Sequence, residues 1–228
     1  MILLETIAEP VAATGMFTWA WTMIAVPAVV AGVLLLAGKL LEAAPVSLRV
    51  SARGELSTED VDTLGLSAVR GLFSGITSDP VTFVNAPAVA EGRGVTSEVT
   101  TAPESPNHRS VVDVRVVHAD GSAVNVAGTL SGPQLVEKIV QINGRNFDLR
   151  AEGYNLIVHY NDQPGALGKI GTLLGGANVN ILAAQLSQDV DGDSAIVMLR
   201  LDTDVPEDVR SALAAAVDAT TLEVVDLS

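Results

Sequence analysis

Residues 160–167 form a turn whose composition suits the binding of a small zwitterion. Here the chain leaves a predicted strand and enters a predicted helix through Pro164, Gly165, Ala166 and Leu167. Backbone N–H groups at a helix start lack intrahelical partners, so they can hold a carboxylate. Asp162 offers an anion for an ammonium group, Tyr160 a hydroxyl, and Asn180 both a donor and an acceptor. The alternative is structural: Asp162 caps the helix and Asn180 is a turn residue.

Four basic residues indicate a second site, for a small anion. Lys138, Arg145 and Arg150 lie within thirteen residues of each other around an Asn-Gly turn, and Arg200 lies on a later predicted strand. Guanidinium groups bind phosphate or carboxylate through paired hydrogen bonds, so these residues suit an organic anion held between two domains. Solvated surface charge is the alternative interpretation.

No residue pattern in the sequence is typical of an active site or a metal site. Cysteine is absent, and His108, His118 and His159 do not have metal-ligand spacing. The glycines at 165, 168, 171 and 175 do not match a dinucleotide fingerprint. Most of them fall inside a predicted helix, where small residues allow close approach to a sheet or a partner. We therefore expect no catalytic residue, no metal and no cofactor in this chain.

The overall charge argues against one class of partner. The chain carries 27 acidic side chains against 13 Lys and Arg, a formal net charge of −14. That field repels a phosphate backbone, so we expect no nucleic-acid binding, although one basic pocket for a small anion is still compatible with it. The absence of cysteine fits a reducing cytoplasm, where we expect the protein to be located.

Residues 1–44 form an apolar segment of open status. No charged residue occurs from Pro10 to Gly38, a length that would allow an apolar N-terminal helix to span a membrane. Pro27 interrupts the run, and Glu5 and Glu9 are unlike the basic start of a secretory signal. Three interpretations remain open: a membrane anchor, a signal segment, and an aberrant or merely packed N-terminus.

The rest of the chain is predicted to form an α+β fold of two domains. Over residues 45–152, period-two patterns predict strands at 46–50, 111–118, 123–130, 135–142 and 147–149. Asp120-Gly121 and Asn143-Gly144 are hairpin signals, so the sheet should be largely antiparallel. One helix is predicted after Ser57 and Asp60, taken as its caps, and another from about Pro87.

Over residues 153–228 the predicted elements follow the order βαββαβ, which is the ferredoxin-like plan. Strands are predicted at 155–160, 180–188, 195–202 and 222–225. One helix is predicted from the turn at 162–165 to about residue 176. The other is predicted to begin at Pro206, with Asp204 as its cap, and to end near residue 217.

Several runs carry a resemblance to one enzyme family. The run NLIVHYNDQPGALGKIGTLLGGANVNILAAQLSQD is similar to the ACT domain that ends D-3-phosphoglycerate dehydrogenases. Upstream, RGLFSGITSDPVTFVNAPAVAEGRGVTSE, ESPNHRSVVDVRV and GPQLVEKIVQINGRNFDLRAEG resemble the intervening domain of the long form of that family, as in actinobacteria. The resemblance covers about Leu40 to Ser228.

The resemblance implies roles for the residues singled out above. In this family the ACT domain binds L-serine, the end product of the pathway, as a feedback inhibitor, and its effector contacts match Tyr160, Asp162 and Asn180. Its ACT domains pair across a subunit boundary into a continuous sheet, with serine at the interface. The intervening domain carries an anion or substrate-analogue site, to which Lys138, Arg145, Arg150 and Arg200 would correspond.

The sequence departs from the family at its start. The family's catalytic and NAD-binding domains precede the matched segments, and neither pattern occurs here. The resemblance therefore implies the regulatory half of a dehydrogenase of L-serine biosynthesis, without turnover of its own, from a truncated or frame-disrupted gene. NAD would belong to the missing domains. A membrane-tethered amino-acid sensor, anchored through residues 10–38, is the alternative.

Overall fold

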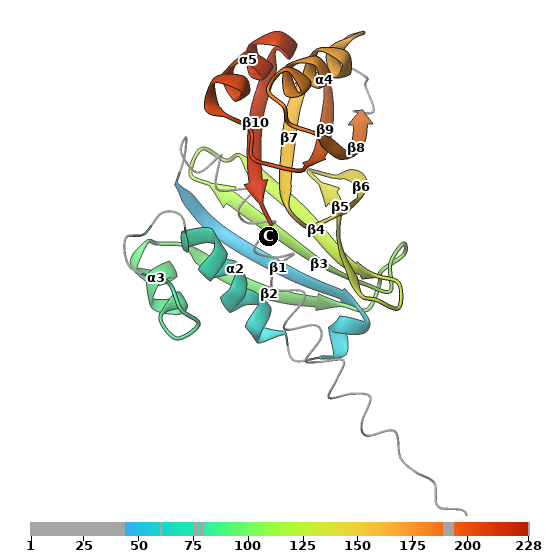
Figure 1. Cartoon of the computed structure of the whole chain (residues 1–228). Coiled ribbons are helices and arrows are strands. Elements are labelled where there is room, and N and C mark those ends of the chain that lie inside the picture. The colour runs from blue at the N-terminus through green and yellow to red at the C-terminus, as the bar shows by residue number, and fades with distance from the viewer. Residues whose placement is uncertain (1–43, 60, 75–76, 78–79, 189–193, 228) are drawn as a thin grey trace, which may run out of the picture.

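The structure is a computed structural model that describes residues 44–227 except 60, 75–76, 78–79 and 189–193. The described part of the chain is a mixed α+β fold with two sheets (Figure 1). The apolar segment 10–38, for which a helix was predicted, lies outside the described residues. Among those residues, no helix has the length and apolarity needed to cross a membrane.

The larger sheet has the strand order β2-β1-β3-β4-β5-β6. Its strands are β1 (Pro45–Gly54), β2 (Thr96–Ala102), β3 (Ser110–His118), β4 (Ala123–Ser131), β5 (Val136–Ile142) and β6 (Arg145–Arg150). Neighbouring strands pair antiparallel, except that β1 and β2 are parallel. The predicted Asn143-Gly144 hairpin is confirmed, and both residues have the positive φ, 49° and 80°, that this tight turn requires.

Two helices cover one face of this sheet at its β1–β2 end. After the short 3-10 helix η2 (Glu55–Thr58) come α2 (Asp62–Ser74) and α3 (Ala86–Gly92). Leu64, Ala68 and Leu72 of α2 are buried in one core with Leu48 and Val50 of β1. The proposed cap Ser57 is wrong, because it lies in η2 and α2 begins only at Asp62. The other proposed cap, Asp60, lies outside the described residues.

The smaller sheet has the strand order β10-β7-β9-β8, and all neighbouring strands are antiparallel. The elements are β7 (Tyr154–Asn161), α4 (Ala166–Gly176), β8 (Ile181–Gln188), β9 (Ser194–Leu201), α5 (Glu207–Val217) and β10 (Ala219–Asp226). The predicted βαββαβ order is therefore present. Helices α4 and α5 cover one face, where Leu156, Val158, Ile170, Leu174 and Leu213 are buried.

The starts of these two helices differ from the sequence prediction. Gly165 occupies the position before α4 with φ 88°, and no side chain caps the helix, so Asp162 is not its cap. Pro206 precedes α5, which also has no side-chain cap. Asp204 instead accepts hydrogen bonds from the Val205 backbone N–H and from Arg210. Asp162 is thereby available for a role other than capping.

The other face of the smaller sheet packs on the larger sheet. Ile157, Ile196 and Met198 of β7 and β9 belong to the same buried cluster as Val126 and Phe147 of β4 and β6. Figure 1 shows the smaller sheet stacked between the larger sheet and its own two helices. One continuous apolar core therefore joins the two sheets.

Candidate functional site

The first half of the predicted zwitterion site lies where β7 ends and α4 begins. Tyr160 is only 1% exposed and packs in the core beneath the two helices. Burial, and next the negative charge of Asp162, raises the pKa of the Tyr160 phenol above its usual value. The Asp162 carboxylate accepts a hydrogen bond from the Gln188 side chain at the end of β8. An ammonium group could take the place of this amide.

The start of α4 adds N–H donors that have no partner within the helix to the same place. The first intrahelical hydrogen bond runs from the Lys169 N–H to the Gly165 carbonyl, at 3.0 Å. The N–H groups of Leu167 and Gly168 precede it in the helix, where intrahelical acceptors do not exist. Together with the dipole of an eleven-residue helix, they favour a carboxylate close to Asp162.

Asn180 lies at the opposite end of the same sheet. In the strand register, Tyr160 and Gln188 are both level with Ala195, whereas Ile181 and Tyr154 are both level with Leu201. The six residue steps from Tyr154 to Tyr160 span roughly 20 Å of extended strand. Asn180 and Asp162 of one chain are therefore about that far apart and cannot contact one small ligand together. Sequence spacing alone did not reveal this separation.

Strand β8 is an edge of the smaller sheet and is partly apolar. Within the described residues it pairs with β9 alone. Leu182 and Leu186 on this strand are 50% and 40% exposed, and Leu167 at the start of α4 is 48% exposed. Long edge strands with exposed apolar side chains readily pair with another strand.

The glycines of α4 leave one face of that helix open. A Cβ atom placed on Gly168, Gly171 or Gly175 would meet nothing within 4 Å. The prediction that these glycines permit close approach to a sheet is therefore wrong within one chain. Close approach of a partner stays a prediction.

Three of the four predicted anion-binding residues meet at the C-terminal end of β6, between the two domains. Lys138 and Arg150 are cross-strand neighbours on β5 and β6. Arg200 reaches the same region from β9, where its guanidinium pairs with the Glu152 carboxylate. Arg150 lies 3.8 Å from the same carboxylate oxygen, and the Lys138 ammonium lies 2.7 Å from an Asp148 oxygen. We call Lys138, Arg150 and Arg200 the basic cluster.

The fourth residue, Arg145, lies at the other end of β6. Its guanidinium donates to the Ser194 hydroxyl at 2.6 Å. With His159 and Gln188 it lines an open cavity of about 470 Å³ beside the end of β8. Arg145 and Arg150 are five residue steps apart along the strand, or about 17 Å, so one small anion cannot contact both side chains.

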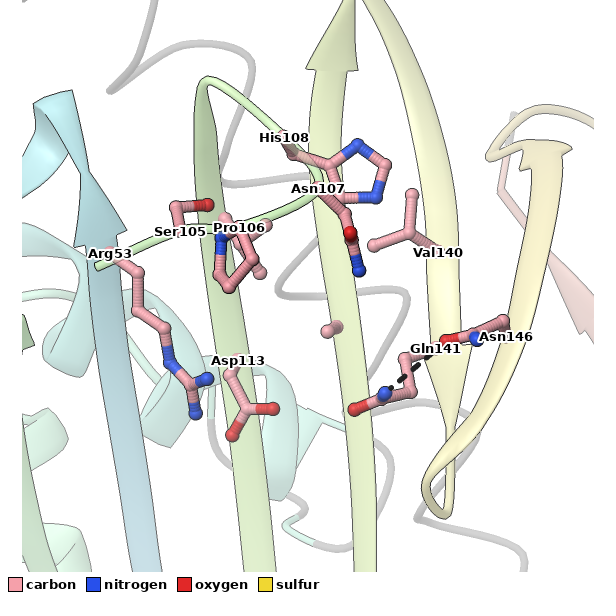
Figure 2. A pocket seen from close by; sticks show the side chains of 11 residues that line it. Arg53, Ser105, Pro106, Asn107, His108, Asp113, Val140, Gln141 and Asn146 are labelled. Carbon is pink, nitrogen blue, oxygen red and sulfur yellow. Dashed lines mark hydrogen bonds between the residues drawn. The ribbon is translucent and has the colours of Figure 1, made fainter.

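A further polar cavity was not foreseen from the sequence. It lies on the face of the larger sheet that is turned away from the second domain, and its volume is about 100 Å³ (Figure 2). Asn107 and His108 come from the loop before β3, and Asp113 and Gln141 from the strands beneath. The Asp113 carboxylate accepts two contacts of 2.9 Å from the Asn125 amide. The only sequence signal was the run ESPNHRSVVDVRV, to which no role was attached.

The part of the chain that the structure describes contains no cluster of side chains that could bind a metal ion. There, no three His, Asp or Glu side chains lie close enough together to hold an ion.

Two family models match the chain. One describes the D-3-phosphoglycerate dehydrogenase intervening domain and matches residues 31–143; the other describes the ACT domain and matches residues 154–218. The sequence predicts that the intervening domain starts at residue 45, whereas the first match begins at residue 31.

Curated relatives point the same way. The chain is 69% identical to the D-3-phosphoglycerate dehydrogenase of Mycobacterium tuberculosis over 194 residues, which are 85% of this chain and 37% of the relative. For the Mycobacterium leprae enzyme of the same name the identity is 68%, with the same coverage. The chain thus spans little more than a third of the length of these relatives.

One solved structure resembles about a third of the chain. A formyltetrahydrofolate deformylase from Pseudomonas syringae matches 32% of this chain and 26% of its own at 15% identity, with a TM-score of 0.28. That likeness is too low to add to the family matches. On the two family models and the mycobacterial relatives, the chain belongs to the D-3-phosphoglycerate dehydrogenase family and carries its intervening and ACT domains.

Proposed function

We propose that this chain is a regulatory part of D-3-phosphoglycerate dehydrogenase in L-serine biosynthesis and binds L-serine as a feedback effector. Asp162 would hold the ammonium group, and the N–H groups that open α4 would hold the carboxylate. Asn180 of a second copy would bind the hydroxyl or the carboxylate. The observation that carries this proposal is the opposite placement of Asp162 and Asn180 along β7 and β8.

A twofold axis through the free edge of β8 would complete the site. If two β8 strands pair antiparallel along their whole length, the start of one lies beside the end of the other. Asn180 of the second copy then lies next to Gln188, whose side chain already contacts Asp162. Each pair of chains would contain two equivalent sites.

The apolar surface supports the same pairing. Leu182 and Leu186 on β8 would lose their exposure to water when a second copy joins the sheet. The open face at Gly168, Gly171 and Gly175 would leave room for the second copy of α4. Dimerisation would thereby explain both the free edge of β8 and the open glycine face of α4.

Calorimetric titration of L-serine into the purified chain tests the proposal. We expect saturable heat for the wild type, and loss of at least tenfold in affinity for Asp162→Ala and Asn180→Ala, because each removes a charged or bidentate contact. Asp208→Ala, an exposed acid on α5, is the control and should bind as the wild type does. Absence of heat at millimolar L-serine would refute the proposal.

We also propose that the basic cluster binds a small phosphorylated or carboxylate anion between the two domains. Lys138, Arg150 and Arg200 bring three positive charges together from both domains, and arginine forks suit phosphate oxygens. Arg145 is not part of this proposal, because it lies at the far end of β6. Titration with inorganic phosphate should give binding that Arg200→Gln abolishes.

Dehydrogenase activity is proposed to lie outside these residues. The sequence has no dinucleotide fingerprint, so we expect no NAD site in this chain. A spectrophotometric assay of phosphoglycerate-dependent NAD reduction should give no rate above background. A measurable rate would show that the chain has catalytic residues that this account does not identify.

A further inference from the structure

The basic cluster already holds a carboxylate of the chain itself. Arg150 comes from the end of β6 in the intervening domain, and Arg200 from β9 in the ACT domain. Their guanidinium groups approach the same oxygen, Oε1 of Glu152, in the connection between the two domains. Lys138 is likewise paired with Asp148 at 2.7 Å. Three cations are therefore opposed by two carboxylates before any external anion arrives.

The backbone that carries Glu152 is fixed on both sides. The fully buried Asn155 amide donates to the carbonyl oxygens of Glu152 and Gly153, at 3.1 and 3.0 Å. The Ala151 N–H donates to the Glu137 carbonyl at 3.0 Å, and the Leu227 N–H to the Gly153 carbonyl at 2.9 Å. A carboxylate on so short and rigid a tether has a high effective concentration at the arginines.

Glu152 nevertheless leaves part of Arg200 unused. The Arg200 Nε is buried and makes no hydrogen bond within the described residues, although the same guanidinium pairs with Glu152 through Nη1. A phosphate has several acceptor oxygens and can engage the Nε–Nη2 edge of Arg200 while it also reaches Arg150, which the single Glu152 oxygen between the two arginines cannot do. An external anion can therefore satisfy a donor that the tethered carboxylate leaves unpaired.

We infer that Glu152 is a tethered competitor of the anion site: an external anion binds to Arg150 and Arg200 only by displacing the Glu152 carboxylate. The exchange also removes the Glu152 contacts that connect these two arginines, and hence a contact that spans the two domains. Glu152 thereby sets the affinity of the site and couples its occupancy to the connection between the domains. This inference rests on the proposed anion binding.

Titration calorimetry with inorganic phosphate on the full chain tests the inference. Glu152→Gln keeps the length of the side chain but removes its charge, so we expect it to bind phosphate about fivefold or more tightly than the wild type. Glu98→Gln is the matched control. Glu98 also pairs with an exposed arginine, Arg49 at 2.9 Å, but on the distant edge of the larger sheet. The phosphate affinity of the Glu98→Gln variant should therefore equal that of the wild type.

The three variants distinguish a competitor role of Glu152 from the existence of the anion site. If Arg200→Gln abolishes phosphate binding while Glu152→Gln leaves it unchanged or weaker, the anion site stands and the competitor role of Glu152 is overturned. An equal gain for Glu98→Gln would also overturn it, because the effect would then be one of net charge. If neither the wild type nor Glu152→Gln binds millimolar phosphate, the anion site itself fails.

Discussion

At the scale of single residues, side chains whose partners are fixed by the fold decide what each site can do. Asn155 is fully buried, and its amide holds the connection between the two domains. The Asp162 carboxylate accepts a hydrogen bond from the Gln188 amide and does not cap α4. A ligand can displace that amide. The sequence indicated Asp162 as a candidate but not Gln188, which is remote in the chain.

Replacement of Asn155 by alanine should weaken the whole chain. The variant removes the Asn155 donor from the carbonyls of Glu152 and Gly153, although Gly153 keeps the Leu227 N–H, and opens a small cavity, at a cost of about 2 kcal/mol. Urea denaturation measures the free energy of unfolding, with the exposed Asn161→Ala as control. Equal stability of the two variants would contradict the anchoring role of Asn155.

Glu223 predicts a pH dependence of stability. Burial raises its pKa above the ordinary 4.5, and the positive charge of Arg210 only partly opposes this. The folded state therefore favours the protonated form, and this contribution to stability is lost as pH rises through the raised pKa. Glu223→Gln should melt at a higher temperature than the wild type at pH 7, and the difference should vanish near pH 3.5.

Thermal melts at both pH values, with the exposed Glu91→Gln as control, check this sign. A wild type that is as stable as Glu223→Gln at pH 7 would show that the carboxylate is well solvated.

At the scale of elements, periodicity predicted buried structure well and exposed structure poorly. The βαββαβ order followed from apolar residues that face one core, such as Leu156, Val158 and Ile170. Strand β2 was missed because Thr96–Ala102 is mostly exposed and polar, and its parallel pairing with β1 has no turn signal. The cap Asp204 was wrong because its carboxylate is bound by Arg210 instead.

The free edge of β8 predicts how the chain dimerises. Leu186→Lys should place a charge in the shared sheet, and Gly171→Leu should fill the room left for a second α4, so both should give monomers. The exposed Val84→Lys, on the other domain, should dimerise as the wild type does. Sedimentation velocity distinguishes the two states. A dimeric Gly171→Leu variant would place the interface elsewhere.

At the scale of the whole molecule, two sheets share one core. Met198 is fully buried and lies in the cluster that includes Val126 and Phe147 of the larger sheet. The sequence indicated two domains because a second series of elements, in the order βαββαβ, begins near residue 153. It did not indicate their contact, because no local pattern reports which sheet covers the second face of β7 and β9.

The shared core predicts that the chain unfolds in one transition. Met198→Ala should lower the free energy of unfolding by about 2–5 kcal/mol and should keep a single calorimetric transition, because both sheets lose the same contact. Two separate transitions in the wild type would show that the sheets unfold independently.

The claim that each L-serine site takes Asp162 from one chain and Asn180 from another has a direct test. Asp162→Ala and Asn180→Ala homodimers should both fail to bind L-serine. When the two variants are mixed in equal amounts and allowed to exchange chains, about half of the dimers are heterodimers. Each heterodimer has one intact site out of two. Calorimetry should therefore show binding at about a quarter of the wild-type capacity. If the mixture binds no more L-serine than its components after exchange is complete, the two residues do not form a site shared between chains, which contradicts this claim.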